Sequence, residues 1–240
     1  MSFRLECKKV KRTGFLPALI GGGILAAVVP VINMVFRSEC YVGLESSPIQ
    51  ILIGANWQMM AMLNILLVVA GACIMYHTEY VDNAIQKMCT LPTKESNLFF
   101  GKFALIAVMC VVILIIEAVA IALCSYHWFE WNVNLEVELL KNFGYFLLLL
   151  LPTVLSALLI ASACKNMWVS LGIGVVCVFI ATMIPTSNFT LSLFPFALPF
   201  QTFAGVTENT IRNFAIAGTI ESIVIAIAEV LFLRVRRSFE

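Results

Sequence analysis

The residues best suited to bind a soluble partner lie in a polar segment, 79–94, between two long apolar stretches. Four apolar side chains there are spaced by four, three and three residues, which places them on one face of a short helix. A proline then ends the helix because its ring lacks an N–H donor. The segment predicts a docking helix, although a surface helix packed on its own bundle or on lipid headgroups would show the same pattern. The apolar residues are Val81, Ile85, Met88 and Leu91; Asp82 and Lys87 lie on other faces, Glu79 precedes the helix and Pro92 follows it.

Carboxyl groups inside apolar stretches form a second candidate site. A lone carboxylate in mid-bilayer costs on the order of several kcal/mol, so it must be protonated, paired or exposed to water. Glu117 and Glu221 fall at similar depth and would line a polar cavity for a cationic peptide or drug, whereas Glu229 would pair with Arg234. The alternative is a packing role, in which neutral acids are hydrogen-bonded to polar neighbours. Those neighbours are Asn33, Asn64 and Thr219.

A third candidate is the aromatic segment 188–204, which is too interrupted by proline to span a bilayer. It predicts a re-entrant or interfacial element. Phe194, Phe196 and Phe200 would form an outer gate, or would simply anchor the segment without touching a substrate.

Motifs of soluble catalysis are missing from the sequence. There is no G-x-x-x-x-G-K-[ST] loop for ATP and no H-E-x-x-H or G-x-S-x-G motif, so we expect no enzyme activity. The eight cysteines include no C-x-x-C pair, so we expect no metal site. A Cys40–Cys124 bridge is left open. No basic tract with interleaved aromatics favours nucleic acid.

Composition defines the scaffold that must position these residues. The chain is 61% hydrophobic and 12% charged, about half the charged fraction of a soluble domain. This predicts an all-α membrane protein with one domain over residues 1–240. A helix at 1–13 would lie on the membrane surface, unless those residues are only a basic tail. Six spans are expected, near residues 15–36, 51–76, 103–125, 142–163, 167–184 and 213–233.

Lysine and arginine are distributed unevenly about these spans. Twelve fall on one side, and only Arg37, Lys141 and Arg212 fall on the other. Because positive residues concentrate on the cytoplasmic side, both termini and the docking helix are predicted to be cytoplasmic. The opposite loops are acidic, with Glu39, Glu45, Glu130, Glu136, Glu138 and Glu208.

The docking segment resembles that of ABC-2 type transporter permeases. The shared pattern is Glu79, a short helix, Leu91-Pro92, and Gly101-Lys102 at the third span. The Leu-Pro-Thr-Lys-Glu segment at 91–95 is similar to permease subunits of lantibiotic-immunity transporters of the mutacin/epidermin type. One departure is Asn83, where many relatives have glycine; asparagine also tolerates unusual backbone angles.

This resemblance implies a permease subunit in a bacterial cytoplasmic membrane. Two such subunits, identical or homologous, would face each other, and a cytosolic ABC ATPase dimer would bind the docking helices. ATP and Mg²⁺ would sit on that partner, and this chain would bind no cofactor. The cargo would be an amphipathic cationic antimicrobial peptide, removed from the lipid bilayer as self-immunity. Alternatives are export of a drug or lipid, an ion-coupled carrier using Glu117 and Glu221, and a membrane scaffold or sensor.

Overall fold

The computed structural model describes residues 2–11, 13–44, 46–81, 95–129, 135–164, 166–185 and 187–239, and the regular elements in this part of the chain are all helical. The prediction of an all-α, multi-span membrane protein is therefore confirmed. Five helices are long and apolar enough to cross a membrane, and a sixth is shorter.

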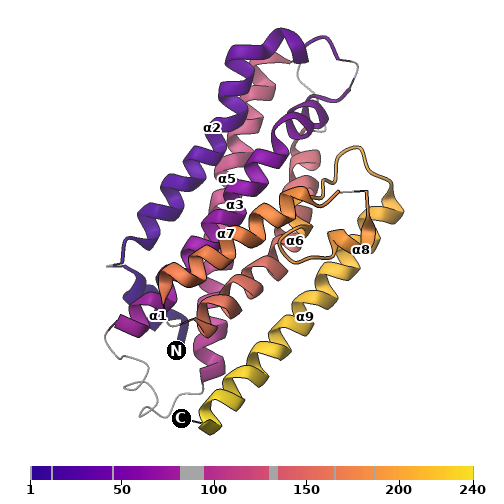
Figure 1. The fold of residues 1–240 in the computed structure, drawn as a ribbon. Helices are drawn as coiled ribbons and strands as arrows, with labels where there is room; N and C mark the ends of the chain where they lie inside the picture. The colour runs from indigo at the N-terminus through magenta and orange to yellow at the C-terminus, as the bar shows by residue number, and fades with distance from the viewer. Residues whose placement is uncertain are drawn as a thin grey trace.

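The surface helix expected at the N-terminus is α1, Ser2–Val10. It leads into α2 through Gly14, whose φ of 75° lies in the left-handed region that glycine adopts without a Cβ clash. This turn lets α1 lie across one end of the bundle, the end that also holds both chain termini (Figure 1). We refer to it as the α1 end.

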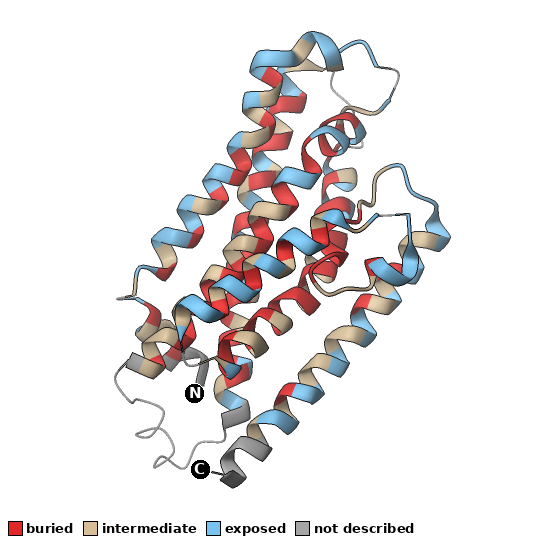
Figure 2. Cartoon of the chain, in the orientation of Figure 1, coloured by how far each residue is buried: buried red, intermediate tan, exposed pale blue. Residues whose placement is uncertain are grey.

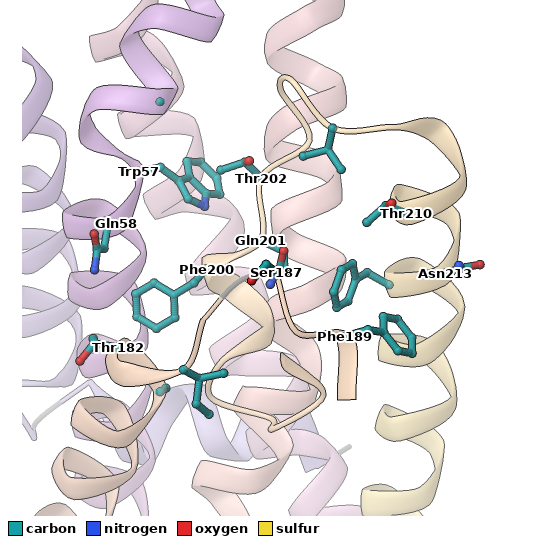
Figure 3. A pocket seen from close by; sticks show the side chains of 15 residues that line it. Trp57, Gln58, Thr182, Ser187, Phe189, Phe200, Gln201, Thr202, Thr210 and Asn213 are labelled. Atoms are coloured by element: carbon teal, nitrogen blue, oxygen red, sulfur yellow. The ribbon is translucent and has the colours of Figure 1, made fainter. Parts of the chain in front are cut away.

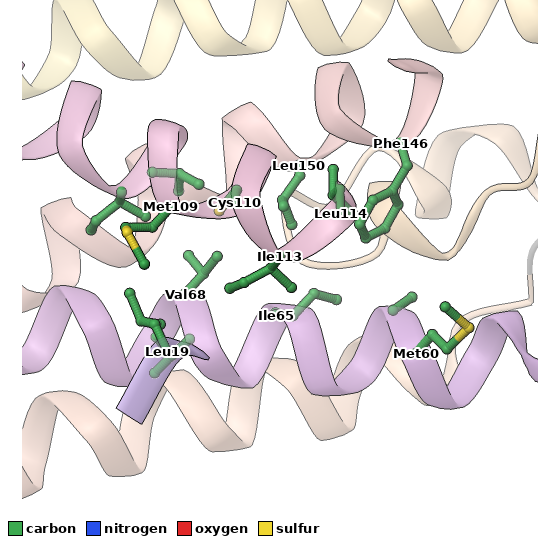
Figure 4. Close-up of a cluster of buried hydrophobic side chains, with 14 of the residues drawn as sticks. Leu19, Met60, Ile65, Val68, Met109, Cys110, Ile113, Leu114, Phe146 and Leu150 are labelled. Carbon is green, nitrogen blue, oxygen red and sulfur yellow. The ribbon is translucent and has the colours of Figure 1, made fainter. Parts of the chain in front are cut away.

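The centre of the bundle is built from α2 (Phe15–Tyr41), α3 (Pro48–Val81) and α5 (Glu95–Trp128). Figure 4 shows their apolar side chains interleaved, with further residues from α6. Helices α2 and α5 approach closely at Gly23, where an added Cβ would lie 2.9 Å from Ile113. Small residues allow such backbone contact between membrane helices, which lack a hydrophobic driving force against lipid.

Two helices continue the bundle on the other side of α3. Helix α6, Leu135–Ala163, is the most buried of the apolar spans, and α7, Met167–Met183, packs on it and on α3. At 1.5 Å per residue the 17 residues of α7 extend roughly 26 Å, slightly less than the hydrocarbon thickness. Asn166 caps α7 by accepting a 3.0 Å hydrogen bond from the backbone N–H of Trp168.

The aromatic segment before the last helix turns back into the bundle, as expected for a re-entrant element. It contains α8, Phe189–Ser192, and a short 3₁₀ helix η1, Leu198–Phe200, whose three residues are buried. The Thr153 hydroxyl of α6 donates a 2.6 Å hydrogen bond to the Pro195 carbonyl. This bond fastens the segment to α6 and satisfies a carbonyl that lies away from water.

The last helix, α9 (Glu208–Phe239), contacts the bundle along one narrow face. Figure 2 shows α9 mostly exposed or intermediate, in contrast to the buried interior of α6. Its exposed side chains are largely apolar and include Ile216, Ile220, Ile223 and Ile227. Such a surface suits contact with lipid tails or another membrane helix.

Candidate functional site

At the α1 end, four charged side chains from three helices form one buried cluster. Glu6 and Lys9 come from α1, Glu79 from α3 and Lys102 from α5. The Lys102 Nζ lies 2.5 Å from the Glu79 carboxylate and 3.4 Å from that of Glu6. Lys9 lies 3.0 Å from Glu6 and 3.1 Å from Glu79. We call these residues the charge cluster.

The charge cluster is electrically balanced and mostly shielded from water. Glu6 and Lys102 are each 1% exposed, and the Lys102 ammonium also lies 5.2 Å from the ring centroid of Tyr76. Partial burial by itself would lower the pKa of Lys9, but the carboxylates of Glu79 and Glu6 outweigh that effect and raise it. Two carboxylates and two ammonium groups thus compensate one another where single charges would be costly.

The charge cluster joins the two helix ends on either side of the predicted docking helix. Glu79 belongs to the last turn of α3, and Lys102 to the early part of α5. Residues 82–94 between these helices lie outside the described residues, as does the side chain of Val81. The docking roles of Val81, Asp82, Ile85, Lys87, Met88, Leu91 and Pro92 therefore stay predictions.

Deeper in the bundle, Glu117 is buried between α5 and α3. It is 1% exposed, and one of its carboxyl oxygens accepts a 3.1 Å hydrogen bond from the Asn64 side chain. Within the described part of the chain its other oxygen has no hydrogen-bond partner. A cross-helix contact of this kind fixes the packing of α3 against α5.

Asn33 belongs to a separate polar contact. Its amide donates a 2.8 Å hydrogen bond to Asn56 and a 3.3 Å hydrogen bond to the Tyr41 hydroxyl. Asn56 in turn donates to the backbone carbonyl of Leu52. This contact joins α2 to α3, so Asn33 and Asn64 do not share one site.

The acidic residues of α9 also lie apart from Glu117. Glu221 is partly exposed and makes no hydrogen bond or ion pair with any residue that the structure describes. Glu229 is fully buried and accepts a 2.8 Å hydrogen bond from Ser162 of α6. The side chain of Arg234, its expected partner, lies outside the described residues. The described contacts thus do not join Glu117 and Glu221 into one site.

A cavity of about 840 Å³ lies at the end of the bundle opposite α1. Figure 3 shows side chains from α3, the end of α7, the re-entrant segment and the start of α9 around it. Of the three predicted gate residues, only Phe200 lines this cavity. Phe196 is buried, and the half-buried Phe194 packs on it with the ring centroids 5.6 Å apart.

Cys40 and Cys124 are free thiols, the former exposed and the latter buried.

Three residues of these sites, Glu6, Trp57 and Gln58, were not predicted from the sequence. Glu6 carried a weak signal, because it is the single acid within a basic stretch and lies three residues before Lys9. Trp57 and Gln58 carried none, since the cavity they line is assembled from segments far apart in the chain.

A comparison with protein-family models is consistent with this architecture. The model described as "ABC-2 family transporter protein" matches residues 2–181, from α1 to near the end of α7. No match was found among curated proteins or among solved structures. Members of this family are the membrane subunits of ABC transporters and lack their own ATPase site. Because the match covers most of its length, the chain belongs to the ABC-2 family of transporter proteins, as a permease subunit that works with an ABC ATPase.

Proposed function

We propose that residues 79–94 receive a cytosolic ABC ATPase and that the charge cluster carries its movement into the membrane helices. The observation that carries this proposal is that three ion pairs, each involving Glu79 or Lys102, join α1, the end of α3 and the start of α5 to one another. A displacement of the segment between α3 and α5 would therefore move both helix ends together. The ATP and Mg²⁺ would be bound by the partner.

The assembly that follows is a pair of permease subunits, identical or homologous, with two ATPase subunits at the α1 end. That end would face the cytoplasm of a bacterium, since most lysine and arginine residues are assigned to it. The apolar face of the docking helix would fill a groove on the ATPase, and Asp82 and Lys87 at its edge would fix the register.

The docking proposal is tested by changing Val81 and Ile85 to Asp and measuring the ATPase that co-purifies with the tagged chain. Full burial of one such side chain contributes about 1.5–3 kcal/mol, so the pair loses about 3 kcal/mol or more and ATPase recovery falls roughly a hundredfold. Gln86→Asp, on another face of the same predicted helix, is the matched control and should leave recovery within about twofold. Unchanged recovery with both apolar residues replaced would refute docking through this segment.

For the cargo, we propose an amphipathic, cationic antimicrobial peptide of the lantibiotic type, removed from the membrane as self-immunity. Two features support this. The segment at 91–95 resembles lantibiotic-immunity permeases, and exposed carboxylates occur where helices end or begin opposite the α1 end. Glu39, Glu136 and Glu208 are exposed there, and such a surface attracts cations.

A second candidate is export of another amphiphile such as a drug or lipid. The cavity favours it, because its volume of about 840 Å³ matches sites that enclose drug-sized molecules and none of its lining residues is charged. The two candidates are separated by loading membranes with a fluorescent lantibiotic or a fluorescent neutral lipid analogue and following ATP-dependent loss of each. Loss of the peptide alone supports the first candidate, and loss of the lipid analogue alone contradicts it.

A further inference from the structure

The cavity opposite the α1 end has the dimensions of a ligand site. Its volume is about 840 Å³, within the range of about 300–1,000 Å³ typical for small-molecule pockets. Four separate parts of the chain line it, namely α3, the end of α7, the re-entrant segment and the start of α9 (Figure 3). Because these segments lie far apart in the sequence, the cavity forms only in the folded chain.

The chemistry of its walls is polar but neutral. None of the 15 lining residues is Asp, Glu, Lys or Arg, and the polar groups are amides and hydroxyls. Aromatic rings alternate with them, and two of these, Phe189 and Phe214, pack with centroids 5.0 Å apart. The polar lining residues are Gln58, Thr182, Ser187, Gln201, Thr202, Thr210 and Asn213. Without charged residues, the walls offer no ion-pair partner for an ionised ligand.

One wall carries an unpaired hydrogen-bond donor. The Trp57 Nε1 is buried and has no hydrogen-bond partner among the described residues, and the whole side chain is only 4% exposed. The ring cannot easily turn to find one, because Phe146 and Phe143 hold it edge-to-face at centroid distances of 4.8 and 6.3 Å. Figure 3 shows its nitrogen-bearing edge on the side nearer Gln201, toward the cavity. A buried donor without an acceptor is unfavourable, so this N–H is suited to an acceptor that a ligand brings against it once the adjoining cavity wall shifts to uncover the nitrogen.

We propose that this cavity binds the uncharged, oxygen-rich part of an amphiphile and that the Trp57 N–H donates a hydrogen bond to a ligand oxygen. Sugar hydroxyls and backbone amide carbonyls share this chemistry, and the aromatic walls accept the adjoining apolar part. The proposal rests on the proposed function for the export of the bound molecule, but binding itself needs no ATPase. In a peptide cargo the cationic groups would remain outside, near the exposed carboxylates.

The test uses three photoreactive probes with the same diazirine-bearing alkyl chain and different heads. One head is glucose, one is an acylated glycine amide and one is trimethylammonium. The full-length chain in lipid nanodiscs is irradiated with each probe, and labelled peptides are mapped by mass spectrometry with increasing non-photoreactive competitor. We expect saturable labelling of the cavity walls by one or both neutral probes. The preference between glucose and amide then identifies the oxygen that is bound. The trimethylammonium probe should label only lipid-facing residues, in proportion to its concentration.

Two variants with matched controls locate the site. A Cβ added at Gly54 or at Gly172 meets no atom within 4 Å, but only Gly54 lines the cavity. Gly54→Phe should therefore lower saturable labelling more than tenfold, and Gly172→Phe should change it less than twofold. Trp57→Phe keeps an aromatic six-membered ring between Phe143 and Phe146 but removes the N–H donor with the rest of the indole, so binding should weaken about three- to tenfold, as for one neutral hydrogen bond. Trp168→Phe, which alters an exposed ring, is its control.

Three results would overturn the proposal. The first is saturable labelling of the cavity by the trimethylammonium probe to the same extent as by the neutral probes. The second is that the competitor reduces the labelling by none of the probes. The third is unchanged affinity in both Gly54→Phe and Trp57→Phe. A failure of ATPase docking through Val81 and Ile85 would leave all these readouts intact. The two proposals can therefore fail separately.

Discussion

Replacing Lys102 with Met tests the charge cluster most directly. Lys102 is 1% exposed and lies 2.5 Å from Glu79 and 3.4 Å from Glu6, so its loss leaves two buried carboxylates facing one ammonium group. Removing one partner of a buried ion pair costs about 3–5 kcal/mol. At about 2–4 °C per kcal/mol for a chain of this size, the melting temperature should fall by roughly 6–20 °C.

Two further variants make the prediction sharper. Lys9→Met leaves the same two carboxylates facing one ammonium group, but the Lys9 side chain is 32% exposed, so its ion pairs are screened and water can reach the carboxylates where it stood. This change should therefore cost about 1 kcal/mol or less, a fall of at most about 4 °C. The double variant Glu79→Gln with Lys102→Met leaves Glu6 and Lys9 as a balanced pair 3.0 Å apart. It should therefore be more stable than Lys102→Met alone, although it carries one more substitution.

The assay is thermal unfolding of the purified chain in detergent, followed by tryptophan fluorescence and by the fraction that stays monodisperse on size exclusion. The ordering of the variants matters more than any single melting temperature. If Lys102→Met and Lys9→Met were equally stable, or if the double variant fell by the sum of its single changes, the cluster would not be one coupled electrostatic unit.

Three other predictions concern the packing of the spans, at Gly23, Glu117 and Thr153. Gly23→Leu should cost about 1–3 kcal/mol because a side chain of α5 occupies the space beside it, whereas Gly21→Leu, which meets nothing within 4 Å, should be neutral in the same unfolding assay. Glu117→Leu should cost about 1–3 kcal/mol by leaving the Asn64 amide unpaired, while Glu117→Gln keeps an acceptor and should unfold close to the wild-type temperature; equal losses would argue against this hydrogen bond. Thr153→Val removes the bond to the re-entrant segment and should speed proteolysis within residues 185–206, with unchanged cleavage contradicting a fastening role.

The sequence was sufficient to predict six apolar helices and their order, because apolar runs of about 20 residues indicate burial in lipid. Five of these helices are longer than predicted, whereas α7 ends one residue earlier. Helix α5 begins at Glu95, whereas the span was expected from 103, and α3 continues to Val81 beyond the expected 76. A charged residue lowers the hydropathy of its segment, so Glu79 and Lys102 made the predicted spans too short. In the structure these two residues neutralise each other in an ion pair.

The candidate sites were predictable only where one segment carries its own pattern. The re-entrant element could be recognised from its prolines and aromatic residues. The amphipathic α1 could be recognised from the helical spacing of its apolar residues. Contacts between segments could not: the pairing of Glu117 with Asn64 rather than Asn33 depends on which faces of α2, α3 and α5 meet. The unpaired Trp57 donor likewise follows from the position of Phe143 and Phe146 on α6.

The charge cluster also constrains how the protein is made. Its α1 members, Glu6 and Lys9, leave the ribosome first, yet Glu79 lies 70 residues after Lys9. Lys102 follows later still, so until two spans have been synthesised and a third has begun, α1 has only the ion pair between its own Glu6 and Lys9. Docking of α1 would thus be a late event in biogenesis, because it requires α3 and α5 to have reached their correct depth in the membrane. A chain with a misplaced second or third span would lose the ion pairs of α1 with Glu79 and Lys102, and α1 would not be held against the bundle.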